Sequence, residues 1–214
     1  MQRNDINNKL NRMIRKIWYC NKYVGKVKEI YYFWLAKQFK FDKWHITPIN
    51  FRPYAMAIVN YLNSINHNKN YNVVEIGCGL GEIIGNIYNC VGKGYDIDKN
   101  VIYAARKIYG NTKFELGSFQ DIKGQNIEYL ITVNFIHGIS PIELKKSYKS
   151  ICDNNNIKFI ILDIVRDKKY EFNHDIRFLF KDTKYNVVKK LVGYATLNGR
   201  REIYILKKTQ RKCV

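Results

Sequence analysis

Residues 73–82 constrain the fold of this chain more than any other stretch. They begin with the apolar run Val-Val-Glu-Ile and continue into a loop with glycines at positions 77, 79 and 81. A short β-rich run bounded by glycines is typical of a central parallel strand, and glycine permits positive φ and close approach of a ligand. Apolar residues at helical spacing follow over residues 82–88. The sequence therefore predicts a strand, a glycine loop and a helix, the start of a nucleotide-binding βαβ unit.

Strand-like and helical patterns alternate through the rest of the chain. Apolar runs predict further strands at residues 91–98, 113–116, 128–135 and 157–165. Helix-start signals stand at Asp98, a candidate N-cap, and at Ser140-Pro141, where serine would cap the helix and proline would occupy its first turn. A third helix is expected from Pro53. Such alternation predicts a parallel sheet with helices on both faces.

The C-terminal part of the chain has a different pattern. Two strand-like runs, residues 185–195 and 200–207, flank Asn198-Gly199, which is the strongest short signal for a β-hairpin. We therefore expect an α/β sheet that is mostly parallel and is completed by an antiparallel hairpin.

Residues 1–49 are expected to form a helical extension, and residues 50–214 the main domain. Apolar positions at helical spacing predict helices over residues 10–18 and 27–39. Residues 1–43 carry eleven Lys or Arg against three Asp or Glu. We favour an extension that covers the main domain as a lid or makes a homodimer contact. The alternative is that it lies on a membrane surface or grips RNA.

Composition limits the classes of function. The formal net charge of +19 suggests a nucleic acid or an anionic membrane as partner. Lys, Asn, Ile and Tyr are over-used together, however, and share AT-rich codons, so we favour an ordinary solvated basic surface. The five cysteines include no C-x-x-C pair, which argues for a reducing compartment and against a zinc site. Since neither a signal peptide nor a long apolar span is recognisable, a cytoplasmic protein is expected.

The spacing of the glycines distinguishes two classes of nucleotide. A dinucleotide-binding loop prefers G-x-G-x-x-G, and Glu82 stands where its third glycine would be. Residues 75–81 and 94–98 instead resemble the first two motifs of the class I S-adenosylmethionine-dependent methyltransferases. Residues 114–121 are similar to the third, although Ser118 stands where the family often has Asp, with Asp121 as a substitute. The resemblance covers about residues 50–208 and implies a Rossmann-like seven-stranded sheet whose last strand is antiparallel.

The same resemblance implies S-adenosylmethionine as cofactor and suggests which residues bind it. Asp96 would accept hydrogen bonds from both ribose hydroxyls, and Glu75 would hold either the loop backbone or the methionyl amino group. Asp98 is expected to cap the next helix. The expected cofactor-binding residues are Glu75, Gly77, Cys78, Gly79, Gly81, Asp96, Ile97, Ser118, Phe119 and Asn134.

Methyl transfer displaces a sulfonium and needs no acid for the leaving group, so the protein mainly positions the acceptor and removes its proton. His137, which follows the fourth strand, is the first candidate for a catalytic base because imidazole titrates near neutral pH; the alternative is a structural histidine. His45 is the rival base. Asp163 would face the mouth of the site, and no metal is expected.

The acceptor is expected to contact Trp44, Arg52 and Tyr54. Arg52 could bind a phosphate or carboxylate on the acceptor, or it could be a surface arginine at a helix start.

Two enzymatic interpretations and one non-enzymatic interpretation follow. The first is a methyltransferase acting on a small polar acceptor, most plausibly O-methylation of a sugar or a related metabolite in glycan modification. The second is ribose or cap methylation of RNA by way of the basic extension. Methylation of a base nitrogen is disfavoured, because residues 134–137 lack the Asn/Asp-Pro-Pro-Tyr/Phe signature of that reaction. The third is a binding subunit that retains the cofactor without catalysis.

Overall fold

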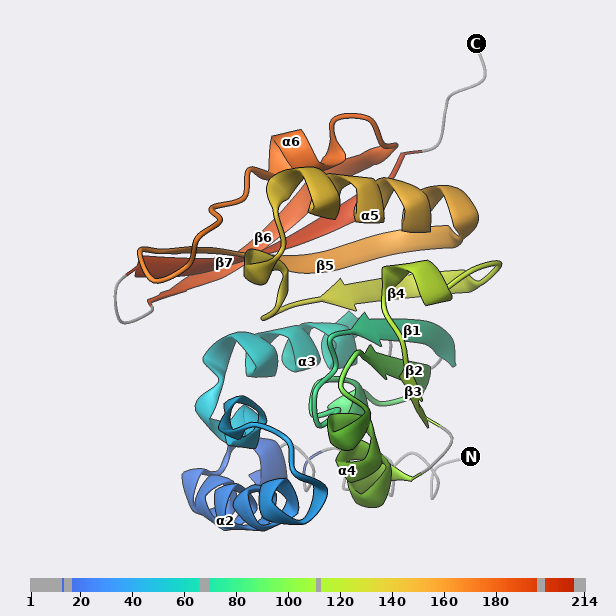
Figure 1. Cartoon of the computed structure of the whole chain (residues 1–214). Coiled ribbons are helices and arrows are strands. Elements are labelled where there is room, and N and C mark those ends of the chain that lie inside the picture. The colour runs from blue at the N-terminus through green and yellow to red at the C-terminus, as the bar shows by residue number, and fades with distance from the viewer. Residues whose placement is uncertain (1–12, 14–16, 66–69, 111–112, 196–198, 210–214) are drawn as a thin grey trace.

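The computed structural model describes residues 13, 17–65, 70–110, 113–195 and 199–209. Seven strands form one sheet in the order β3-β2-β1-β4-β5-β7-β6 (Figure 1). Their bounds are β1 Tyr71–Ile76, β2 Cys90–Asp96, β3 Phe114–Leu116, β4 Asn126–Thr132, β5 Asn156–Asp167, β6 Tyr185–Ala195 and β7 Gly199–Lys208. Strand β7 pairs antiparallel with both β5 and β6, while the other pairs are parallel. The expected mostly parallel sheet with a C-terminal antiparallel hairpin is therefore confirmed.

Helices cover both faces of this sheet. Helix α3 (Pro53–Ile65) and helix α4 (Lys99–Tyr109) pack on one face, and helix α5 (Pro141–Asn154) and helix α6 (Ile176–Phe180) pack on the other. Neighbouring strand residues separate between the two faces: Val73 packs with the first pair of helices, and Val74 with the second. This alternation is the period of two expected for a strand that is buried on both sides.

The helix-start signals at Asp98 and Ser140 are confirmed. Asp98 accepts the backbone N–H groups of Asn100 and Val101 at the start of α4. Ser140 accepts the N–H of Glu143 at the start of α5, and proline follows it in the first turn.

The helix expected over residues 82–88 is wrong, because the chain forms a turn and the short 3₁₀ helix Ile84–Asn86 instead. The Asn86 amide donates to the carbonyl of Glu82 at 2.6 Å, a group that a longer helix would use for the N–H of Asn86. The carboxylate of Glu75 accepts the N–H of Ile84 at 3.0 Å. The chain then turns through Asn89, at φ 54°, into β2.

Two other boundaries differ from expectation. Strand β4 ends at Thr132 instead of residue 135, because Asn134 adopts φ 69°. Strand β5 continues to Asp167, since its last residues pair with the start of β7.

The N-terminal segment contributes helix α2 (Lys22–Phe39) and the short 3₁₀ helices Lys43–Ile46 and Ile49–Phe51. Asn21 caps α2, which therefore begins earlier than the expected residue 27. Tyr32, Leu35 and Ala36 of α2 pack in one cluster with Leu80 of the glycine loop and with α4. Most of the helix expected over residues 10–18 lies outside the described residues, and the division at residue 49 remains a prediction.

Candidate active site

The three glycines of the loop after β1 all have positive φ, 67° at Gly77, 54° at Gly79 and 78° at Gly81. A Cβ at position 77 would lie 2.3 Å from the ring of Phe135, and one at position 81 would lie 2.3 Å from the ring of Phe114. These two glycines are required by packing as well as by conformation. A Cβ at position 79 would meet only His45, at 3.1 Å, so the backbone there can be approached closely.

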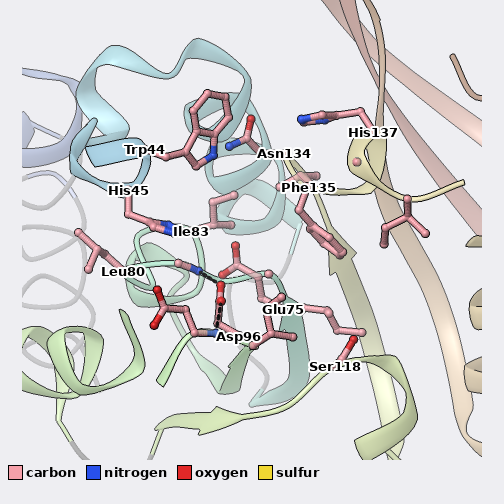
Figure 2. A pocket seen from close by; sticks show the side chains of 18 of the residues that line it. Trp44, His45, Glu75, Leu80, Ile83, Asp96, Ser118, Asn134, Phe135 and His137 are labelled. Carbon is pink, nitrogen blue, oxygen red and sulfur yellow. Dashed lines mark hydrogen bonds between the residues drawn. The ribbon is translucent and has the colours of Figure 1, made fainter. Parts of the chain in front are cut away.

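Asp96 ends β2 and fixes the loop with both carboxylate oxygens. Its Oδ2 accepts the N–H of Gly79 at 2.9 Å, and its Oδ1 accepts the N–H of Asp98 at 3.0 Å. Figure 2 shows the loop and this carboxylate side by side. Asp96 therefore holds the conformation of the glycine loop while it also lines the pocket described below.

Glu75 is buried at the end of β1 and supports the other side of the loop through the N–H of Ile84. Burial is the main cause that raises the pKa of Glu75 to about 8, and the nearby carboxylates Asp96 and Glu82 raise it further. Burial therefore favours a protonated Glu75 at neutral pH, and a cation placed beside this side chain would favour its ionised form.

A pocket of about 500 Å³ lies at the carboxyl ends of β1, β2 and β4. Parallel α/β sheets bind ligands at this edge, and the volume falls in the range of small-molecule sites. It brings together most of the residues predicted from sequence (Figure 2). Those that line it are Trp44, His45, Arg52, Tyr54, Glu75, Gly77, Gly79, Asp96, Ile97, Ser118, Asn134 and His137.

Three predicted cofactor residues do not line this pocket. Cys78 is buried, and its N–H donates to the carbonyl of Tyr95. Gly81 packs against Phe114 as described above. Phe119 is buried against the rings of Phe135 and Tyr148. All three support the walls of the site from behind.

Asp121, the expected substitute for an adenine-binding acid, does not line this pocket. Its carboxylate accepts the N–H of Ser118 at 2.8 Å and so closes a capping box around the short helix Phe119–Asp121. Ser118 itself lines the pocket. The third motif therefore presents serine to the site and uses its aspartate to hold the local backbone.

Glu82, which the sequence marks only as a departure from a glycine pattern, does not line the pocket but holds the structure beside it. It is buried, and its carboxylate accepts the hydroxyl of Tyr32 at 2.8 Å and lies 3.3 Å from the Lys28 ammonium. The N–H of Ile49 and the guanidinium of Arg52, at 2.9 Å, donate to the other oxygen. One carboxylate thus joins the N-terminal segment to the glycine loop.

Arg52 differs from one of the two expectations for it. Its guanidinium pairs with the buried Glu82, so it is not a free surface arginine at a helix start. Arg52 also lines the pocket. A contact with the acceptor remains a prediction for this residue.

A second buried network underlies the end of β4. Arg201 of β7 donates to the carboxylate of Asp163 at 2.6 Å and to the side-chain oxygen of Asn134 at 2.8 Å. The other oxygen of Asp163 accepts the N–H of Asn134 at 2.9 Å, and the guanidinium of Arg201 lies 3.9 Å from the centre of the Tyr54 ring. Asp163 therefore faces Arg201 instead of the mouth of the site. Arg201 was missed, and its only sequence signal is a charged residue within an otherwise strand-like run.

His137 lies in the segment after β4 and is buried against the ring of Tyr170, with ring centres 3.8 Å apart. Its Nδ1 has no hydrogen-bond partner among the described residues. Burial, followed by the positive charges of Arg201 and Lys169, lowers the pKa of His137 to about 4. The ring is therefore neutral near pH 7, and the expectation that it titrates there is corrected.

His45 and Trp44 belong to the short helix Lys43–Ile46 and approach the pocket from the N-terminal segment. The ring of His45 lies over Gly79, as the 3.1 Å approach shows, and its Nε2 is 3.6 Å from Asp42. The Lys169 ammonium lies 5.6 Å from the Trp44 ring and 4.7 Å from the Tyr170 ring. The N-terminal segment and the segment after β5, which are far apart in sequence, therefore meet beside the pocket.

Among the described residues, no group of three or more His, Cys, Asp or Glu side chains is placed to hold a metal ion. No helix in the described part of the chain is long and apolar enough to span a bilayer.

Comparison with known proteins gives a match at the level of structure. No protein-family model and no curated protein sequence matches this chain. Among solved structures, magnesium protoporphyrin IX methyltransferase (ChlM) from Synechocystis PCC 6803, with bound S-adenosylhomocysteine, superposes with a TM-score of 0.66 at 14% identity. The match covers 88% of this chain and 99% of that one. The chain has the class I methyltransferase fold.

Two further structures share this methyltransferase fold. The bifunctional kinase-methyltransferase WbdD gives a TM-score of 0.54 at 16% identity over 74% of this chain and 39% of that chain. PH1948 from Pyrococcus horikoshii, provisionally assigned as an RNA methyltransferase, gives 0.54 at 14% identity over 78% and 85%. At such identities the likeness concerns the class I fold, and the activity must be argued from the site.

Proposed function

We propose that this protein binds S-adenosylmethionine in the pocket at the end of β1 and transfers its methyl group to a hydroxyl of a small polar acceptor. The observation that carries the proposal is the meeting of three features in one cavity: the positive-φ glycine loop, the strand-end carboxylate of Asp96 and the buried Glu75. The ChlM structures with bound S-adenosylmethionine or S-adenosylhomocysteine support the same cofactor.

The residues present suit this cofactor. Gly79 lines the pocket with its N–H held by Asp96, and Asp96 presents acceptor oxygens at the end of β2 for the two ribose hydroxyls. Glu75, which lines the same cavity, would pair with the methionyl amino group. When bound, the cofactor supplies an electrophilic methyl group on a sulfonium. The protein then has to orient the acceptor and take up its proton.

His137 is the candidate for taking up that proton. His137 lines the pocket as a neutral imidazole, and such a ring can accept a hydrogen bond from an acceptor hydroxyl at its unprotonated nitrogen. Figure 2 shows the ring at the edge of the pocket, beyond Asn134 and Phe135. His45, across the glycine loop, remains the alternative base.

A sugar or related metabolite is the favoured acceptor class. Trp44, His45 and Tyr54 give the pocket several flat rings next to polar groups, a combination that suits the apolar and hydroxyl faces of a sugar. Methylation of RNA ribose or a cap is the second candidate, favoured by the net charge of +19 and by the similarity to PH1948.

Two measurements test the proposal in order. Titration calorimetry with S-adenosylmethionine and S-adenosylhomocysteine tests the cofactor, and absence of binding by both would reject the assignment. A screen with methyl-labelled cofactor then compares nucleotide sugars with RNA under matched conditions. Label on RNA, with a binding affinity that falls steeply as salt rises, would favour the second candidate, since counterion release is the mark of phosphate contacts. Cofactor binding without label on any acceptor would favour a non-catalytic binding subunit.

A further inference from the structure

Helix α2 has two apolar faces. The inner face consists of Gly25, Tyr32, Leu35 and Ala36, which are buried against the domain. The outward face carries Tyr23, Val27, Ile30 and Trp34, which are 86%, 69%, 72% and 51% exposed. We call these four residues the outer stripe. Their spacings of four, three and four residues place them in one line along the whole helix.

The outer stripe is not the ordinary scatter of apolar residues on a protein surface. Single exposed apolar side chains are common, but a continuous line of them marks a contact surface. Figure 1 shows α2 at the lower end of the molecule, while β6 and β7 lie in the upper part, and among the described residues the outer stripe remains exposed. The helix is therefore held by one face and offers the other to a partner.

The charges beside the outer stripe are of one sign. Lys22, Lys26 and Lys37 are exposed on the outward half of α2. The helix has one acidic residue, Glu29, and Lys26 already pairs with it at 3.0 Å. The surface is therefore apolar along its centre and basic at its margin, which is complementary to a partner with an apolar interior and an anionic boundary.

This combination decides between three classes of partner. A second copy of the chain would bring lysines against lysines. RNA could stack on Tyr23, but the Trp34 ring is already stacked on Tyr31 and has the Lys107 ammonium 4.7 Å from its centre. RNA would also leave Val27 and Ile30 unused, because aliphatic side chains neither stack on bases nor neutralise phosphates. An anionic bilayer surface matches both parts, since it buries the apolar line at the acyl boundary and attracts the lysines to its headgroups. We propose that the outer stripe docks this protein on an anionic lipid surface, with α2 lying in the plane of the interface.

Vesicle flotation with the full-length protein tests the proposal. Vesicles of phosphatidylcholine containing about one third phosphatidylglycerol are compared with phosphatidylcholine alone. We expect binding to the anionic vesicles and at least about tenfold weaker binding to the neutral ones, with partial loss in high salt. The double variant Val27→Glu, Ile30→Glu should lower binding to anionic vesicles by about tenfold or more.

A matched control separates the helix from general charge. The double variant Ile142→Glu, Val188→Glu makes the same change of charge at residues that are 63% and 54% exposed on α5 and β6. It should keep most of the vesicle binding, and Lys26→Gln, Lys37→Gln should weaken binding to anionic vesicles only. Equal losses in the two glutamate variants, or unchanged binding in the α2 variant, would overturn the proposal. Absence of vesicle binding would also overturn it. If the protein then forms a dimer that the variant Val27→Glu, Ile30→Glu dissociates, the surface belongs to a contact with a second copy.

Discussion

The guanidinium of Arg52 lies 2.9 Å from the buried carboxylate of Glu82, and this pair joins the N-terminal segment to the glycine loop. Replacing Glu82 with Gln leaves Arg52 and the largely buried Lys28 without their counter-charge. We expect a loss of about 3 kcal/mol in the free energy of unfolding, measured by urea denaturation, because a broken buried ion pair leaves an uncompensated charge. Affinity for S-adenosylmethionine should fall as well, since the loop loses its anchor.

The control for that change is Glu29→Gln on the same helix. Glu29 pairs with Lys26 on the surface, where the two side chains are 37% and 70% exposed. Exposed pairs contribute about 0–1 kcal/mol, so this variant should unfold almost like the wild type. Similar losses in the two variants would show that the Glu82 network is not the anchor described above.

Asp96→Asn should weaken S-adenosylmethionine binding by about tenfold to a hundredfold in calorimetric titration. The carboxylate of Asp96 accepts the Gly79 N–H and, in our proposal, the ribose hydroxyls. The amide of asparagine has only one acceptor oxygen for these contacts. Asp98→Asn is the comparison, because asparagine caps a helix about as well as aspartate. An equal loss from this second change would argue that the ribose contact lies elsewhere.

Affinity for S-adenosylmethionine should rise with pH up to about 8 and then level off. Burial raises the pKa of Glu75 to about 8, so the group carries a proton at neutral pH. A cationic ligand beside it favours the carboxylate, lowers its pKa and releases that proton. Calorimetry at pH 7 in buffers of different ionisation enthalpy should detect the release, and Glu75→Gln should abolish it. Proton uptake, or no change with buffer, would place the amino group away from Glu75.

His137→Gln should lower turnover by about a hundredfold at saturating cofactor, the usual scale for loss of a general base. Because the pKa of His137 is lowered to about 4, the neutral form persists across neutral pH and is lost only as the pH falls toward 4. The acid limb of the rate profile should therefore bend near pH 4 instead of 6.5. Loss of turnover in His45→Gln, with His137→Gln active, would assign the base to His45.

Much of the fold could be predicted from the sequence because its signals are local. Gly77, Gly79 and Gly81 stand where the chain needs positive φ, and Asp98 and Ser140 stand where helices need caps. The helix expected over residues 82–88 failed although its apolar periodicity was right, because the Asn86 amide occupies the carbonyl of Glu82 and the chain turns at Asn89 with φ 54°. The apolar pattern does not contain these two interruptions.

Some residues of the candidate site could likewise be placed from the sequence, and others could not. Asp96 and Glu75 could be placed at the pocket from motif spacing, because residues at the ends of adjacent parallel strands meet at one edge of the sheet. The contact of Arg201 with Asp163 could not be predicted from motif spacing, because only the antiparallel hairpin brings β7 beside β5. The neutral state of His137 depends on burial and on charges from β7 and the segment after β5.

The sequence by itself determined the glycine loop, the alternating strands and helices and the C-terminal hairpin, since each follows from backbone conformation or a short period. Only the tertiary structure decided that Glu82 anchors the N-terminal segment. It also decided which apolar face of α2 is buried and which is the outer stripe, because both faces have the helical period. Burial and ion pairing depend on which distant residues meet, and that is settled by packing of the whole chain.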